Sequence, residues 1–208
     1  MKIVVKERSD VVARVLDILS SYQVSESGTF LTVDVVDEYA PHALSLSETA
    51  PVLLNDFLAS HADGGVLIIS AKPHLGDIML LFEQHLLDKK HIVLFGMHVC
   101  SAEEYSFLQR HNIQYFNMIE MTREGLTETT DAVMAFVRQW PSFHLLFYLD
   151  ALDTAFGVPY SIPGGFTLRE MLYVLQRIKL IKSLSSIELM LERDVAESVI
   201  AKIVSEIG

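Results

Sequence analysis

Short apolar runs alternate with segments of helical periodicity along most of the chain. Runs rich in Val, Ile, Leu and Phe with the length of β-strands occur at residues 3–5, 30–36, 66–70, 91–95, 114–116, 144–149 and 186–191. Continuous apolar runs of this kind are typical of strands that are covered on both faces of a sheet. Between them, apolar side chains recur every three or four residues over 11–19, 132–140, 168–175 and 196–207, which predicts amphipathic helices. The alternation predicts an α/β fold with a mainly parallel sheet and helices on both faces.

Capping signals and loops add detail to this prediction. Pairs with the spacing of an N-cap residue and a glutamate that bonds back to it are Ser101 with Glu104, Thr167 with Glu170, and Asp194 with Glu197. The two loop-rich segments are 37–50 and 153–165, and both follow predicted strand ends. Ligands of open parallel sheets bind beyond the carboxyl ends of the strands, so we expect both loops to border any site.

Composition limits the class of protein. The 208 residues are 50% hydrophobic, which predicts one domain over 1–208 with a substantial core. The net charge of −11 argues against binding to a nucleic-acid backbone. No apolar run approaches the roughly 18–20 residues that span a bilayer, so we expect no membrane association. The first ten residues do not resemble a signal peptide, and Cys100 is the single cysteine. We therefore expect a protein of the reducing cytoplasm.

Two neighbouring segments are the most informative about function. They are 147–156, FYLDALDTAF, and 163–170, PGGFTLRE. They resemble the arginase/agmatinase (ureohydrolase) family, in which a strand ends S-x-D-x-D-x-x-D-P-x-F and P-G-G-L-T-x-R-E then opens a helix. Residues 65–77 fall where that family has a strand ending D-A-H-x-D, and 186–192 resembles its strand ending in glutamate. The resemblance covers residues 43 to 208 and implies an arginase-like three-layer sandwich.

The same resemblance implies a metal site that is largely lost here. In the family, a hydroxide that bridges two manganese ions attacks a guanidinium or amidine carbon. Two such ions need about six oxygen or nitrogen ligands, most of them anionic. The corresponding positions of this chain are Glu48, Ser70, Lys72, His74, Tyr148, Asp150 and Leu191. Because Asp150 is the one position here that keeps a family ligand aspartate, the resemblance implies no bound metal, and manganese only if the ligand set is rebuilt.

Lysine at a ligand position suggests how the lost charge is replaced. An ammonium group is repelled by a nearby dication and cannot act as a ligand while protonated. We therefore expect Lys72 to take the place of the cations and to pair with Asp150 and Glu48. Asp153 matches the third family aspartate, which implies that it supports the loop and does not bind metal.

Three functions remain open. The first is a non-catalytic arginase-like protein with a binding or regulatory role, acting as a homo-oligomer or on a family-related protein partner. The alternative is a divergent hydrolase of a guanidino, amidino or other C–N substrate, in which Lys72, His74 and Asp150 are the candidate catalytic residues. Its site would be metal-free or would hold one metal with Glu48. The third is a metal-free binder of a cationic ligand at Asp150 and Asp153.

Other reactive side chains lack a catalytic context. Cys100, Ser70 and Ser161 have no sequence motif that would make them nucleophiles. The remaining histidines, which show no mutual ligand spacing and are expected at the surface or at strand ends, are His42, His61, His85, His91, His98, His111 and His144. The sequence therefore favours a protein without catalysis over an enzyme.

Overall fold

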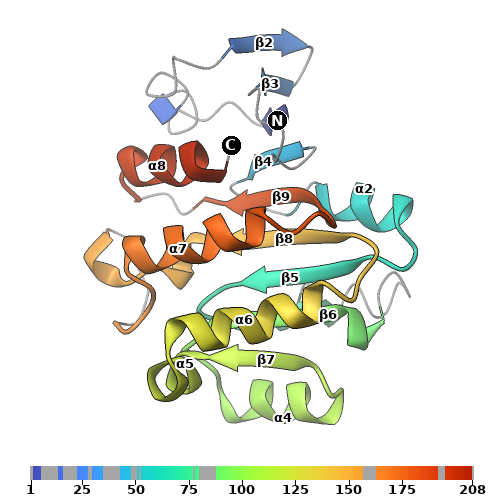
Figure 1. Cartoon of the computed structure of the whole chain (residues 1–208), viewed down its shortest axis with the longest axis vertical. Coiled ribbons are helices and arrows are strands. Elements are labelled where there is room, and N and C mark those ends of the chain that lie inside the picture. Colours follow the sequence, from blue (N-terminus) through green and yellow to red (C-terminus); the bar gives the residue numbers. More distant parts are fainter. Residues whose placement is uncertain are drawn as a thin grey trace.

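The computed structural model describes residues 2–5, 14–15, 23–27, 30–34, 43–47, 51, 53–76, 78–79, 88–156, 163–191 and 195–207. These residues form one nine-stranded sheet in the order β2-β3-β1-β4-β9-β8-β5-β6-β7 (Figure 1). The strands are β1 (Lys2–Val5), β2 (Gln23–Ser27), β3 (Phe30–Asp34), β4 (Ala43–Ser47), β5 (Gly65–Ile69), β6 (Ile92–Met97), β7 (Gln114–Asn117), β8 (Phe143–Tyr148) and β9 (Leu184–Met190). β3 pairs antiparallel with β1 and with β2, and the other neighbouring strands pair parallel, so the predicted mainly parallel sheet is confirmed.

Helices cover both faces of this sheet. They are α2 (Leu53–Ser60), α4 (Ala102–Arg110), α5 (Met118–Glu124), α6 (Leu126–Val137), α7 (Leu168–Lys179) and α8 (Glu197–Ile207). Side chains of a strand alternate between the two faces. Leu67 and Ile69 accordingly pack in one core with α6, α7 and α8, whereas Val66 and Ile68 pack in a second core with α2 and α4. The three-layer α/β architecture is therefore confirmed.

The predicted helix caps are present where the structure describes them. Ser101 Oγ accepts a hydrogen bond from the amide of Glu104 at 3.2 Å, and the Glu104 carboxylate accepts from the amide of Ser101 at 2.7 Å. Thr167 and Glu170 form the same reciprocal pair at the start of α7. The third predicted cap, at Asp194, lies outside the described residues.

The prediction of a loop over 37–50 was wrong in its second half. Residues Ala43–Ser47 form β4, which lies between β1 and β9 and pairs parallel with both. Its sequence, ALSLS, alternates small polar and apolar residues and so lacks the continuous apolar run of the other central strands. Of the predicted helix 11–19, the structure describes residues 14–15, which are helical.

No helix in the described ranges combines the length and the apolar character that crossing a bilayer requires.

Candidate functional site

Two of the segments that resemble the family, 65–77 and 147–156, meet at one edge of the sheet. β5 and β8 are parallel neighbours, with Ile69 opposite Phe147 at their carboxyl ends. Ser70 directly follows β5, and Asp150 lies in the short 3-10 helix η2 (Leu149–Ala151) that follows β8. Parallel pairing therefore brings Ser70 and Asp150 together, as the resemblance implies.

Asp150 is the centre of this edge, and the protein itself supplies donors to its carboxylate. Oδ1 accepts a hydrogen bond from Ser70 Oγ at 3.0 Å and from the amide of Ala71 at 3.1 Å. Oδ2 lies 3.4 Å from His74 Nε2, close enough for an ion pair when the imidazole is protonated. The residue is only 7% exposed. Oδ1 is thus hydrogen-bonded inside the protein, as a buried carboxylate requires, and Oδ2 faces the imidazole.

His74 packs against Tyr148, another family ligand position that carries a different residue in this chain. Its backbone has a φ of +47°, in the left-handed region that residues other than glycine seldom adopt. Its ring stacks on Tyr148, with centroids 3.7 Å apart and an angle of 14° between the planes. Tyr148 is buried and stands where the family has the first aspartate of D-x-D. An aromatic ring therefore packs beside the imidazole at a position where the family has a carboxylate.

The predicted pairing of Lys72 with Asp150 was wrong. Lys72 is exposed, and among the residues that the structure describes the ionic partner of Asp150 is His74. Only the backbone of Lys72 reaches the cluster, through its amide, which donates to Ser70 Oγ at 3.1 Å. An ammonium group loses much hydration energy on burial, so the side chain is more stable in solvent. The other proposed partner, Glu48, lies outside the described residues.

The described residues do not fit a binuclear manganese site. Leu191 follows β9 and is buried in the apolar core, so it offers no donor atom. Glu192, next to it, lies outside the described residues. Among the side chains that are described, no group of three His, Cys, Asp or Glu residues is gathered in a way that could hold a metal ion. His74 and Asp150 remain as donors, far fewer than the roughly six that two ions need.

The Ser70, Asp150 and His74 side chains also do not form a nucleophilic triad. In a triad, the serine donates to a histidine that acts as a base. Here Ser70 donates to Asp150, and its own exposure is only 1%. The hydroxyl is therefore neither activated nor accessible, which agrees with the prediction from sequence.

Asp153 fixes the loop that leads into α7. Its Oδ2 accepts from the amide of Gly164 at 2.8 Å, and its Oδ1 accepts from the amide of Ala155 at 3.0 Å. These bonds, that of Gly164 first, lower the pKa of the Asp153 carboxyl. Gly165 passes so close to the chain that a Cβ on it would lie 2.6 Å from the carbonyl oxygen of Ala151. The implied role of Asp153 in supporting the loop is confirmed, and its carboxylate is already engaged.

A second buried polar cluster, which the sequence analysis missed, lies between β8, β9 and α2. Glu188 Oε2 accepts from the amides of Leu53 and Leu54, at 3.1 and 3.2 Å, in the first turn of α2. His144 Nδ1 lies 2.7 Å from Ser186 Oγ, and its Nε2 lies 3.7 Å from Glu188 Oε2. His144 is fully buried near the start of β8, so of its two expected places the surface was wrong. The glutamate ties α2 to the sheet.

His144 should make the fold sensitive to acid. Burial lowers its pKa from 6.5 to about 3, so the imidazole is neutral in the folded protein. Between these values the unfolded chain binds the extra proton, and stability falls as the pH falls. From pH 7 to pH 5 this amounts to about 2 kcal/mol.

Urea unfolding at pH 7 and pH 5 tests this expectation. The wild type should lose about 2 kcal/mol more than His144→Gln over that interval, because glutamine does not titrate. Equal losses in both proteins would show that His144 is not the acid-sensitive group.

Comparison with known proteins identifies the family of this chain. The sequence profile described as the Arginase family matches residues 17–206. Human arginase-1 is 31% identical over 108 residues, which are 50% of this chain and 34% of that protein. Staphylococcus aureus arginase is 28% identical over 115 residues, covering 53% and 38%. The matched segment thus spans little more than a third of these relatives.

Solved structures show the same fold. Bacillus subtilis arginase superimposes with a TM-score of 0.70 at 17% identity, over 79% of this chain and 70% of that one. Formimidoylglutamase from Bacillus subtilis gives a TM-score of 0.71 at 17% identity, over 79% of this chain and 59% of that one. With the fold shared and nearly the whole sequence matched by the family profile, the chain belongs to the arginase family.

Proposed function

We propose that this protein is a non-catalytic member of the arginase family with a binding or regulatory role. The observation that carries the proposal is the state of Asp150. Ser70, Ala71 and His74 surround its carboxylate, at the position where the family pattern has a metal-binding aspartate. An aspartate whose Oδ1 accepts two hydrogen bonds from the protein and whose Oδ2 faces a histidine serves the fold and has little capacity left to hold a catalytic cation.

The neighbouring substitutions support the same conclusion. Ser70 and Tyr148 replace carboxylates, and neither supplies the negative charge that balances a dication. Leu191 replaces the late glutamate and is buried among apolar side chains. Hydrolysis in this family depends on a hydroxide made at the metal pair, so loss of the ligands removes the nucleophile itself.

Assembly with another protein is the remaining route to function. The chain keeps the arginase fold while its ligand positions differ from the family pattern, which is compatible with a role that does not use the metal site. We propose that its surface serves self-assembly or assembly with a family-related protein.

A single-metal hydrolase is the second candidate, and one observation favours it. His74 Nε2 is buried, makes no hydrogen bond and faces Asp150 Oδ2 at 3.4 Å. Two donors at this separation could share one cation. A third ligand would have to come from outside the described residues, and Glu48 is the candidate.

Metal content separates the two proposals. The protein would be incubated with manganese, freed of excess ion and analysed by elemental mass spectrometry, with Bacillus subtilis arginase treated in parallel. We expect far less than one ion per chain and no urea or ammonia release from guanidino or amidino compounds. About one ion per chain, lost in His74→Ala, would favour the single-metal hydrolase. About two ions per chain with hydrolysis would overturn the first proposal.

A further inference from the structure

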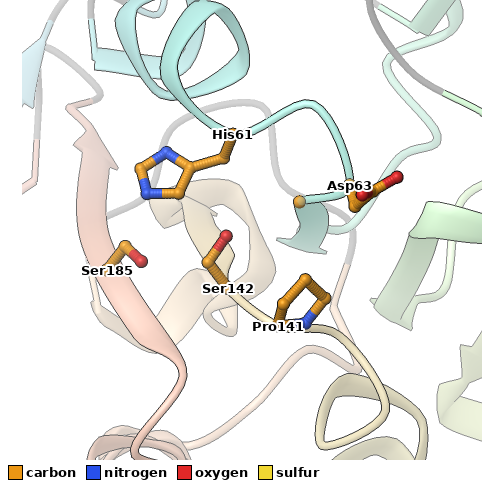
Figure 2. Close-up of a pocket in the computed structure, with 6 residues that line it drawn as sticks. His61, Asp63, Pro141, Ser142 and Ser185 are labelled. Carbon is orange, nitrogen blue, oxygen red and sulfur yellow. The ribbon is translucent and has the colours of Figure 1, made fainter.

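A hollow lies at the edge of the sheet opposite Asp150. A cavity of about 520 Å³ lies where β5, β8 and β9 begin (Figure 2). Its lining residues are His61, Asp63, Gly64, Pro141, Ser142 and Ser185. This volume is in the range of small-molecule sites.

His61 presents one nitrogen to this cavity in a defined state. Its Nδ1 lies 3.0 Å from the carbonyl oxygen of Phe57, and a carbonyl only accepts, so Nδ1 must carry the hydrogen. The Nε2 of a neutral ring is then a hydrogen-bond acceptor. The ring also stacks on the Phe57 side chain, with centroids 4.6 Å apart and planes 18° apart. Stacking and the hydrogen bond together fix the direction of Nε2.

Two serine hydroxyls complete the polar lining. Ser142 and Ser185 project toward the same space as the His61 ring in Figure 2. Neither hydroxyl bonds to a residue that the structure describes. The backbone beneath them is fixed, because Gly65 donates to the carbonyl of Ser142 at 2.9 Å and Phe143 donates to that of Ser183 at 2.8 Å. The cavity is therefore a preformed arrangement of one acceptor and two hydroxyls that donate or accept.

Charge narrows the class of ligand. The described lining contains no lysine or arginine, and the chain carries a net charge of −11, so an anion is disfavoured. Asp63 is the lining carboxylate, and Figure 2 shows it turned away from His61 and the serines. A cation would therefore find no counter-charge beside the polar groups. A neutral ligand rich in hydroxyls matches this lining.

We propose that this cavity binds a neutral polyol of about the size of a monosaccharide. One ligand hydroxyl donates to His61 Nε2, and ligand oxygens accept from Ser142 and Ser185. Pro141 and Gly64 offer apolar contact to the C–H face of the ligand. The site is separate from Asp150 and does not depend on the function proposed above.

Amide chemical shifts of the ¹⁵N-labelled protein would test the proposal, with glycerol, D-ribose and myo-inositol as probes. We expect saturable shifts confined to residues 61–64, 141–142 and 185 for at least one of them. The double variant Ser142→Ala/Ser185→Ala should weaken binding by about tenfold or more, since each lost hydrogen bond contributes about 1 kcal/mol. The exposed serine of α4 supplies a matched control, Ser106→Ala, which should bind as the wild type does.

His61→Phe keeps the stacking on Phe57 but removes Nε2, so it too should weaken binding. Inorganic phosphate and arginine serve as the anionic and cationic comparison probes. The proposal is overturned if no polyol gives saturable shifts, if phosphate or arginine binds in its place, or if the folded double variant binds polyol unchanged.

Discussion

Asp150→Ala is expected to lower the free energy of unfolding by about 3 kcal/mol or more. The substitution leaves the Ser70 hydroxyl and the Ala71 amide without their buried acceptor. An unpaired buried donor costs about 1–3 kcal/mol, and two such donors are created here. Urea unfolding at pH 7 gives the difference directly.

The sign of this effect also bears on function. A ligand carboxylate kept for catalysis is often a source of instability in the metal-free protein, and its removal can then stabilise the fold. A carboxylate that serves the fold behaves in the opposite way. Asp153→Ala is the comparison variant, because it removes a partly exposed loop aspartate and should cost less stability than Asp150→Ala. If Asp150→Ala were as stable as the wild type or more stable, a structural role of Asp150 would be contradicted.

The effect of manganese on the melting temperature tests the role of Asp150 independently. A cation that bound through Asp150 would raise the melting temperature of the wild type and not that of Asp150→Ala. We expect no shift in either protein.

Much of the central sheet could be predicted from the sequence because its strands are buried on both faces. β5 and β8 read as continuous apolar runs, and they are wholly buried. β2, with the sequence QVSES, gave no such signal, because an edge strand does not need apolar side chains on both faces. The strand β4 was missed for a related reason, since its serines interrupt the apolar run.

The candidate site was predictable in position but not in its contacts. Motif order placed Ser70, His74 and Asp150 at one sheet edge, and parallel pairing of β5 with β8 brings them together. Which side chain lies beside Asp150 depends on the path of the backbone, and the left-handed conformation of His74 could not be predicted from residue types. As a result, the Lys72 side chain is exposed to solvent and the His74 imidazole lies beside the Asp150 carboxylate.

The sequence does contain a sign of the buried polar cluster on β8 and β9. His144 and Glu188 are polar residues inside the apolar runs FHLLFY and LSSIELM. A polar side chain in a strand covered on both faces must find a partner within the protein. That rule predicts pairing for both residues, although it does not say that the partners of Glu188 are the amides of α2.

Glu188→Ala is expected to cost about 3 kcal/mol of unfolding free energy and to loosen α2. The amides of Leu53 and Leu54 would lose their acceptor at a helix end, where the backbone has no intrahelical partner to offer. Hydrogen exchange of α2 amides should quicken more than exchange in α7. Glu188→Gln keeps one acceptor oxygen and should lose less stability, while the exposed Glu124→Ala on α5 should be close to neutral.

The same substitution should also affect the cavity beside His61. α2 begins at the amides held by Glu188 and ends at Ser60, directly before His61, whose imidazole bonds back to the carbonyl of Phe57 in that helix. Loosening α2 should therefore disorder the nitrogen that faces the 520 Å³ cavity and weaken polyol binding in Glu188→Ala, with Glu124→Ala unchanged. Unchanged exchange in α2, together with wild-type stability, would show that its first turn does not depend on the glutamate.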